Sequence, residues 1–484
     1  MTLRDVLADP GAPAVEVSAL AYDNRAVTPG TLFFCVPGFT RDGHDFAPDA
    51  VARGAAALVV QRPLGLGVPE ILVPDVRAAM APAAARLYGD PTAALRTVGI
   101  TGTNGKTTTA FLVRALLEAG GLRTGLLGTV GAIVGGERRD AVRTTPEAID
   151  LQRTFREMLD AGDEAVAMEV SSHALALGRA GAIHWDVAVF TNLTQDHLDF
   201  HDDMEDYFDA KRARFTAGRP RVRVVNVDDP GGRRLAAEFP DAVTVALEDP
   251  RATLRATDLE PSPACTRFRA GGLRLTVPLP GRFNVLNALC AVAAARALGV
   301  GDAAIAAGLE SAALAPGRFE PVDEGQPFAV LVDYAHTPDS LGHVLRAARD
   351  LAGGRVLAVF GAGGDRDRGK RPLMGEVAAR GADVVVVTSD NPRTEAPGAI
   401  IADILPGLER TGTARLSGPA AHGGARGFLV EPDRRAAIAL AVSLARPGDA
   451  VLVAGKGHED YQIVGTTKHP FSDREEALRA LGTA

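Results

Sequence analysis

The sequence predicts an α/β protein of three domains, and three observations lead to that prediction. The chain has 484 residues, which is too long for one ordinary hydrophobic core. From residue 95 onward, patterns of buried strands alternate with helical patterns, as in largely parallel sheets covered on both faces. A helix end at Tyr88-Gly89-Asp90-Pro91 and a turn at Pro316-Gly317 interrupt the pattern. We therefore expect domains over residues 1–94, 95–321 and 322–484.

Each segment has its own elements. The first contains short apolar runs at 31–36 and 55–60 among turn residues. In the second we expect strands at 95–100, 165–170 and 187–191, with helices at 107–119 and 284–297. In the third we expect strands at 328–333, 356–360, 384–388 and 450–454, each followed by a polar, Gly-rich loop. Since ligands bind at the carboxyl ends of parallel strands, a cleft between the second and third domains is the expected active site.

The composition excludes several classes of protein. Hydrophobic residues make up 46% and charged residues 23%, which is typical of a folded globular chain. The formal net charge is −8 and no basic stripe is visible, so we expect no nucleic-acid partner. The three cysteines, Cys35, Cys265 and Cys290, are far apart and favour a reducing compartment. The N-terminal residues resemble no signal peptide and no run of about 18 apolar residues occurs, so we expect a cytoplasmic protein without a membrane span.

The strongest local signal is the segment 99–108, Gly-Ile-Thr-Gly-Thr-Asn-Gly-Lys-Thr-Thr, between an expected strand and an expected helix. Its glycines allow a tight turn whose N–H groups point at phosphate oxygens, and the helix N-terminus adds positive charge. Lys106 can reach the β- and γ-phosphates, and the Thr107 hydroxyl suits Mg²⁺. Five residues separate Gly99 from Gly105 where the standard pattern has four, so the strict pattern fails. The alternative is a purely structural turn between strand and helix.

Acidic and histidine side chains follow the next two expected strands. Glu169 lies at the end of one, where a carboxylate could hold Mg²⁺ beside the phosphates. Asp196, His197 and Asp199 follow the other, which indicates either a metal or phosphate site or an Asp-rich helix N-terminus. Lys211 lies in a helical stretch and would, by itself, be interpreted as a solvated surface lysine.

Taken together, these residues resemble the Mur ligase family, ATP-dependent amide-forming ligases of cell-wall synthesis. Eight matching features occur in the family's order, between about residues 20 and 475: TGTNGKTT (101–108), Thr144-Thr145-Pro146, EVSSH (169–173), TNLTQDHLD (191–199), AKRARF (210–215), GRFNVLNALCA (281–291), APGRFE (315–320) and DYAHTPDSL (333–341). The resemblance implies a first domain that holds the UDP end of the substrate, a central ATPase domain and a Rossmann-like third domain. It also implies ATP and Mg²⁺ as cofactors and an acyl-phosphate intermediate.

The resemblance further implies roles for individual residues. The ATP contacts are Gly102, Thr103, Asn104, Gly105, Lys106, Thr107, Thr108, Asn287, Arg318 and Asp333. The metal ligands are Thr107, Glu169, His197 and Lys211, the last as a carbamate, and Lys106, Lys211, Glu169 and His197 form the catalytic set. The contacts to the nucleotide-linked peptide are Tyr22, Asn24, Thr144, Thr145, Ser171 and Arg179. Asn24, Arg143 and Leu177 depart from the residues usual in the family, which leaves the peptide contacts open.

The third segment points to the amino acid that is added. Asp390-Asn391-Pro392-Arg393 resembles the signature of relatives that add meso-diaminopimelate to UDP-MurNAc-L-Ala-D-Glu, and Arg366, Gly455 and Glu459 complete the expected site. Meso-diaminopimelate carries a second amino-acid head at its far end. Arg393 or Arg366 can pair with the carboxylate of that head, and Glu459 can bind its ammonium. A lysine substrate would leave the arginine unpaired.

Other interpretations remain open from the sequence. The four residues could form a plain Asn-Pro turn. The chain could instead be a lysine-adding ligase or resemble folylpolyglutamate synthetase. A non-catalytic ATP-binding regulator would be expected to have lost Lys106, Glu169 or Lys211, and all three are present. We expect a monomer whose partners are its small-molecule substrates.

Overall fold

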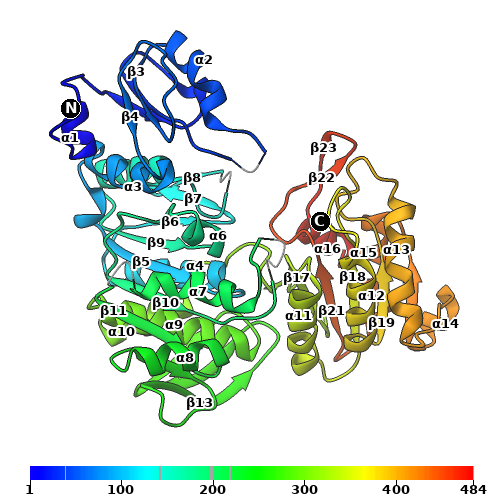
Figure 1. Ribbon diagram of the computed structural model, residues 1–484. Coiled ribbons are helices and arrows are strands. Elements are labelled where there is room, and N and C mark those ends of the chain that lie inside the picture. The colour runs from blue at the N-terminus through cyan, green and yellow to red at the C-terminus, as the bar shows by residue number, and fades with distance from the viewer. Residues whose placement is uncertain (39, 141–142, 197–199, 217–219, 483–484) are drawn as a thin grey trace.

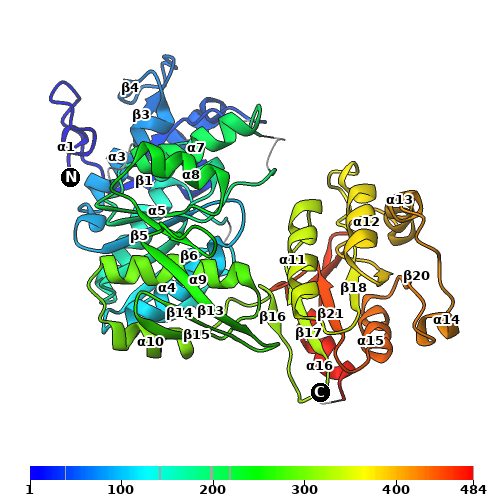
Figure 2. The ribbon, with the colours of Figure 1, turned by 90° about the horizontal axis from the view of Figure 1, so that it is seen from below.

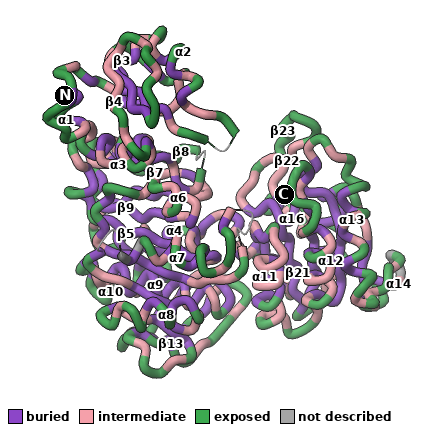
Figure 3. Tube along the Cα trace, in the orientation of Figure 1, coloured by how far each residue is buried: buried purple, intermediate pink, exposed green. Residues whose placement is uncertain are grey.

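The computed structural model describes residues 1–38, 40–140, 143–196, 200–216 and 220–482. The first two sheets lie in one part of the molecule and the third sheet lies in another beside it (Figures 1 and 2). Buried residues follow the strands and the inner faces of the helices (Figure 3). The predicted α/β class is confirmed. None of the helices that the structure describes combines the length and apolar character needed to span a lipid bilayer.

The first sheet is parallel, with strand order β1-β2-β3-β4. Both apolar runs of the first segment form strands, β2 and β3. The β-branched and aromatic side chains of these strands are buried between the helices. The elements are β1 (Ala19–Ala21), β2 (Thr31–Phe34), β3 (Ala55–Val60), β4 (Glu70–Leu72), α1 (Leu3–Leu7), α2 (Ala47–Ala52) and α3 (Val76–Leu87), with short 3-10 turns η1 (Asn24–Ala26), η2 (Gly43–Phe46) and η3 (Pro91–Ala93).

The second sheet has the order β15-β14-β13-β12-β11-β10-β5-β9-β6-β7-β8. Its strands run parallel from β13 to β6, and antiparallel hairpins extend it at both ends. Its strands are β5 (Arg96–Thr101), β6 (Thr124–Gly128), β7 (Gly131–Val134), β8 (Glu137–Arg139), β9 (Ala165–Glu169), β10 (Val187–Phe190), β11 (Val222–Asn226), β12 (Val243–Ala246), β13 (Leu254–Pro261), β14 (Thr266–Ala270) and β15 (Leu273–Val277).

Helices cover both faces of this sheet. Apolar residues of α4, α9 and α10 pack on one face, α5 packs on the other, and α7 and α8 pack beside β10 and β11. The predicted helices at 107–119 and 284–297 are α4 and α9. The helices are α4 (Lys106–Ala119), α5 (Ala148–Asp160), α6 (Ser172–Ala176), α7 (Met204–Thr216), α8 (Pro230–Glu238), α9 (Arg282–Ala297) and α10 (Asp302–Glu310).

The third sheet has the order β16-β17-β21-β18-β19-β20, and β16 is its antiparallel edge. The late strand β21 lies between β17 and β18. β16 belongs to this sheet, although the predicted boundary at 321 placed it in the second domain. The elements are β16 (Glu320–Pro321), β17 (Ala329–Asp333), β18 (Val356–Phe360), β19 (Val384–Val387), β20 (Gly427–Val430), β21 (Ala450–Ala454), the hairpin β22 (Tyr461–Val464) and β23 (Thr467–Pro470), and helices α11 (Pro338–Leu351), α12 (Lys370–Gly381), α13 (Pro397–Arg410), α14 (Gly418–His422), α15 (Arg434–Leu444) and α16 (Asp473–Ala480).

The parallel register brings three strand ends to one edge of the second sheet. Ile100 of β5 is paired with Glu169 of β9, and Thr101 is paired with Phe190 of β10. The phosphate loop, the Glu169 carboxylate and the loop after β10 therefore leave the sheet side by side, as expected for a ligand site at the carboxyl ends of strands.

Candidate active site

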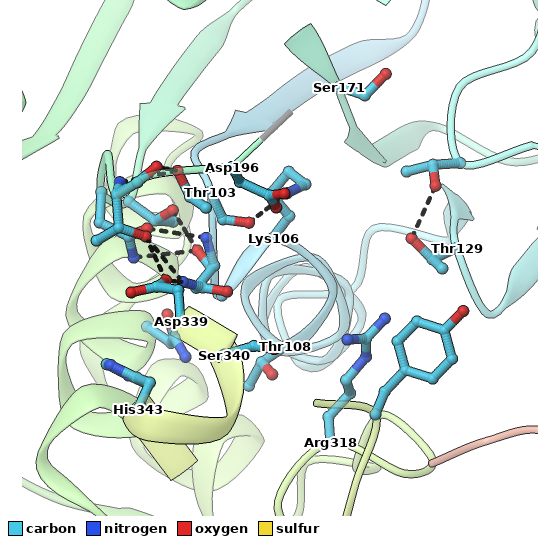
Figure 4. Close-up of a pocket in the computed structure, with 18 of the residues that line it drawn as sticks. Thr103, Lys106, Thr108, Thr129, Ser171, Asp196, Arg318, Asp339, Ser340 and His343 are labelled. Carbon is cyan, nitrogen blue, oxygen red and sulfur yellow. Dashed lines mark hydrogen bonds between the residues drawn. The ribbon is translucent and has the colours of Figure 1, made fainter. Parts of the chain in front are cut away.

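A cavity of about 850 Å³ lies between this sheet edge and the third domain. Side chains of the phosphate loop face Arg318 and the start of α11 across it (Figure 4). The cavity brings together many residues that the sequence predicted. They are Thr103, Asn104, Gly105, Lys106, Thr108, Thr144, Thr145, Ser171, Arg179, Lys211, Asn287, Arg318 and Asp333.

Two glycines give the phosphate loop its shape. Gly105 caps α4 with φ of +83°, and a Cβ there would lie 2.3 Å from Asn287 Oδ1. A Cβ on Gly102, with φ of +147°, would lie 1.9 Å from Thr191 Oγ1. Side chains are therefore excluded at both positions. The first N–H groups of an α-helix have no partner within the helix, so the start of α4 beside this loop suits a phosphate.

Lys106 lies at the start of α4. Its Nζ donates hydrogen bonds to Gly102 O at 2.8 Å and Thr103 O at 2.7 Å. Burial lowers the pKa of Lys106, while Glu169 and Asp196 act in the opposite direction. The side chain thus lies where an anion over the loop would be within its reach.

Glu169 and Thr107 lie beneath the cavity. Glu169 is 1% exposed, and its Oε2 accepts hydrogen bonds from Thr107 Oγ1 at 2.9 Å and Thr129 Oγ1 at 3.1 Å. Thr107 gives its one proton to Glu169, so its lone pairs stay available to a cation. Hydroxyl and carboxylate oxygens are the donors that Mg²⁺ prefers, so this pair fits the ion. His197, the third predicted ligand, lies outside the described residues.

Lys211 is buried, with 1% of its surface exposed, so its interpretation as a surface lysine is wrong. Its Nζ donates to Gly102 O at 3.0 Å and lies 4.4 Å from the Tyr207 ring centroid. Burial, with a smaller effect of the nearby Lys106 charge, holds the pKa of Lys211 well below its usual value. Sequence periodicity missed this burial because α7 packs under the phosphate loop, a contact between segments far apart in the chain.

Asp333 and Arg318 form the wall that the third domain contributes. The Asp333 carboxylate accepts hydrogen bonds from the N–H groups of Phe319 and Ala335, each at 2.7 Å. Burial raises the pKa of Asp333 to about 6. The Arg318 guanidinium lies over the Tyr334 ring, 4.7 Å from its centroid.

The predicted peptide contacts fall into two groups. Thr145 Oγ1 donates to Glu169 O at 3.0 Å and accepts from Ser171 N at 3.1 Å, so this group is tied to the end of β9, the strand that carries Glu169. Arg179 pairs with Glu147 at 3.0 Å. Tyr22 and Asn24 lie apart from the cavity-lining residues in the described part of the chain. Tyr22 donates to Asp150 at 2.7 Å and Asn24 to Asp49 at 2.7 Å.

The predicted diaminopimelate residues form a second cluster, at the carboxyl edge of the third sheet. Asn391 Nδ2 donates to Glu459 Oε2 at 2.7 Å. Arg393 has φ of +51° and donates from Nη1 to Gly364 O at 2.8 Å. A Cβ on Gly455 would lie 2.4 Å from Asp390 Oδ2, so only glycine fits there. Arg366 is exposed. None of these described residues lines the 850 Å³ cavity.

Sequence reasoning missed several residues at both places. Lys456 is fully buried and donates to Asn391 Oδ1 and Glu459 Oε2, each at 3.1 Å. Asp339 accepts from Thr194 Oγ1 at 2.7 Å, which joins α11 to the loop after β10. A lysine between two glycines directly after a strand was the available signal for Lys456. Asp339 lies within the matched segment 333–341, at the start of the helix, but no role was predicted for it.

Comparisons with known proteins agree along the whole chain. Three family models match successive segments: the Mur ligase family, catalytic domain, over residues 16–88; the Mur ligase middle domain over 100–295; and the Mur ligase, glutamate ligase domain, over 317–457. A UDP-N-acetylmuramoyl-L-alanyl-D-glutamate–2,6-diaminopimelate ligase of Geobacter metallireducens is 47% identical over 97% of this chain and 95% of its own. The enzyme of that name from Streptomyces coelicolor is 47% identical over 97% and 93%.

A solved structure is also similar. The structure of a UDP-N-acetylmuramoyl-L-alanyl-D-glutamate–2,6-diaminopimelate ligase superposes with a TM-score of 0.71 at 32% identity, and covers 100% of this chain and 99% of that one. The resemblance inferred from the eight motifs is thereby confirmed by whole-chain similarity. The chain belongs to the Mur ligase family.

Proposed function

We propose that this chain uses ATP to join meso-2,6-diaminopimelate to UDP-MurNAc-L-Ala-D-Glu, a step of peptidoglycan precursor synthesis. The observation that carries the proposal is the cluster around Asn391, Arg393 and Glu459, placed at the carboxyl edge of the third sheet. Relatives at 47% identity carry the name of this activity. The phosphate loop and Glu169 supply the ATP side of the reaction.

The reaction needs positioning and charge neutralisation from the protein more than covalent chemistry. A carboxylate oxygen of the glutamyl residue attacks the γ-phosphorus, the bond to ADP breaks, and an acyl phosphate forms. The amine of diaminopimelate then attacks the acyl carbon, loses a proton, and inorganic phosphate leaves. Lys106 and the N–H groups of the loop neutralise the phosphates, while Thr144, Thr145, Ser171 and Arg179 hold the peptide.

Magnesium would be held by Thr107 and Glu169, with His197 and a carbamate on Lys211 as further ligands, and would neutralise charge on the transferred phosphoryl group. Lys211 is suited to carbamylation because burial holds its pKa well below the usual value, which favours the neutral amine, the form that can add to carbon dioxide. The carbamate would turn this buried amine into an anionic oxygen ligand beside Lys106.

The modification can be observed directly. Protein equilibrated with carbon-13-labelled bicarbonate is expected to show a carbamate resonance that the Lys211→Met variant lacks. Lys468→Met is the matched control, because Lys468 is exposed and lies over the Tyr461 ring on the β22–β23 hairpin. A resonance of equal intensity in Lys211→Met would contradict the assignment.

For amino-acid selection, the guanidinium of Arg393 pairs with the carboxylate at the far end of diaminopimelate, and Glu459, which Asn391 orients, holds the ammonium. Glu459 Oε2 is already occupied by Lys456 and Asn391, so its other oxygen is the one that faces a ligand.

The test of the function measures phosphate release from ATP in the presence of Mg²⁺ and UDP-MurNAc-L-Ala-D-Glu. The rate with meso-diaminopimelate is compared with the rate with L-lysine. Release that requires the nucleotide-peptide and favours diaminopimelate supports the proposal. A preference for lysine would keep the chemistry and overturn the selection by Arg393. Release with neither amino acid would reject the proposed acceptor, and a folate acceptor would be tested next.

A further inference from the structure

Thr129, directly after β6, lies between two parts of the site that were described separately. Its N–H donates to Glu169 Oε1 at 2.8 Å and its Oγ1 donates to Glu169 Oε2 at 3.1 Å. The same Oγ1 lies 3.0 Å from Thr144 Oγ1, a hydrogen bond drawn in Figure 4. One hydroxyl thus touches both the carboxylate of the metal site and a predicted peptide contact.

Counting protons fixes the direction of this chain of hydrogen bonds. A hydroxyl has a single proton to donate, and an ionised carboxylate can only accept. The Thr129 proton therefore goes to Glu169, and toward Thr144 the Thr129 oxygen can only accept. Thr144 must then donate its own proton to Thr129, which leaves only the lone pairs of Thr144 facing the cavity that it lines.

The backbone holds this arrangement closely. A Cβ on Gly128 would lie 2.1 Å from Glu169 Oε1, so the strand end approaches the carboxylate as nearly as a glycine allows. The N–H of Thr129 is fixed against the same oxygen. The hydroxyl is the part of Thr129 that extends beyond Glu169 and reaches Thr144.

We propose that Thr129 is a positioning residue for the peptide substrate: it orients Thr144 as a hydrogen-bond acceptor for an N–H group of the acceptor peptide, with Glu169 as the anchor. The inference rests on the proposed function, because it takes UDP-MurNAc-L-Ala-D-Glu as the acceptor. It adds that Thr144 does not donate to a carboxylate or phosphate oxygen of that substrate.

The test compares Thr129→Val, which has a similar shape and no hydroxyl, with Thr129→Ser, which keeps the hydroxyl. Both retain the N–H that binds Glu169. Binding of UDP-MurNAc-L-Ala-D-Glu is measured by calorimetry without ATP, so that no turnover occurs. We expect binding roughly tenfold weaker in Thr129→Val, the size of about one hydrogen bond, and near wild type in Thr129→Ser. In the steady state, KM for the nucleotide-peptide should rise while KM for diaminopimelate stays constant.

Two further variants separate this role from a general structural one. Thr244→Val removes a hydroxyl from a similar threonine pair. Thr244 lies on β12, away from β6 in the strand order, and its Oγ1 is 3.2 Å from Thr253 Oγ1. This variant should leave binding of the nucleotide-peptide unchanged. Thr144→Val should weaken binding in the wild-type background and have little further effect in Thr129→Val, because the two hydroxyls act as a unit.

Wild-type affinity in Thr129→Val, or additive effects of the two valine variants, would overturn the inference. The failure of the proposed function looks different: the wild-type protein itself would neither bind the nucleotide-peptide nor release phosphate with it.

Discussion

Replacing Lys106 with methionine is expected to reduce phosphate release by about a thousandfold or more, in line with the loss of a preorganised charge at a phosphoryl-transfer site. The ammonium lies on the first residue of α4 and is held by two carbonyls of its own loop. Methionine keeps the length of the side chain and removes the charge. Phosphate release with saturating ATP, nucleotide-peptide and diaminopimelate measures the effect.

Lys468→Met controls for the loss of a lysine elsewhere and should retain full activity, since Lys468 is exposed on the β22–β23 hairpin. A thermal melt of Lys106→Met close to that of the wild type would show that the fold survives. Residual activity within tenfold of the wild type would contradict the role of Lys106 in ATP turnover.

Replacing Arg393 with alanine should raise KM for meso-diaminopimelate by one or more orders of magnitude, the effect of about 1.5–3 kcal/mol for a hydrogen bond to a charged group. The backbone of Arg393 is fixed by bonds to Ile463 and Gly465, and Nη1 is held by Gly364 O. The guanidinium is therefore oriented before the ligand arrives, which favours bidentate pairing with a carboxylate. KM values for ATP and for the nucleotide-peptide should stay near wild type.

Two other arginine variants sharpen this test. Arg393→Lys keeps the charge without the planar fork and should recover only part of the affinity. Arg368→Ala removes an exposed arginine of the neighbouring loop that pairs with Glu395, and should leave KM for diaminopimelate unchanged. If Arg393→Ala had the wild-type KM, the assignment of Asp390-Asn391-Pro392-Arg393 to the far end of diaminopimelate would be wrong.

The sequence predicted the elements that carry strong local patterns. Apolar runs such as 165–170 and 356–360 became β9 and β18, because a strand buried on both faces needs continuous apolar residues. The hairpins β6–β8 and β13–β15 were not predicted. Glu137–Arg139 is exposed and carries no apolar pattern, and the alternation in β14 and β15 extends over only five residues each. Strand order was also beyond local patterns, because it depends on contacts between segments far apart in the chain.

In the site, too, contiguous motifs were predicted and contacts between distant segments were not. The phosphate loop was predicted because strand, glycines, lysine and helix are contiguous. Residues joined only by folding were missed or misinterpreted, as with the burial of Lys211. The pair of Arg434 and Asp473, both fully buried, is another such case. Arg434 also donates to Ser389 O and Ala454 O, the residues that precede Asp390 and Gly455, so it supports the cluster around Asn391 and Glu459, although no sequence motif marks it.

The position of β21 has a consequence for how the third domain is made during synthesis. β17 and β18 do not pair with each other; both pair with β21, which lies at 450–454, near the end of the chain. A nascent chain that has emerged only as far as β20 still lacks β21. The edges of β17 and β18 that pair with β21 in the finished sheet are then unpaired. The third domain therefore closes only after residue 454 has left the ribosome, whereas the first domain can pair its four strands as soon as residue 72 has emerged.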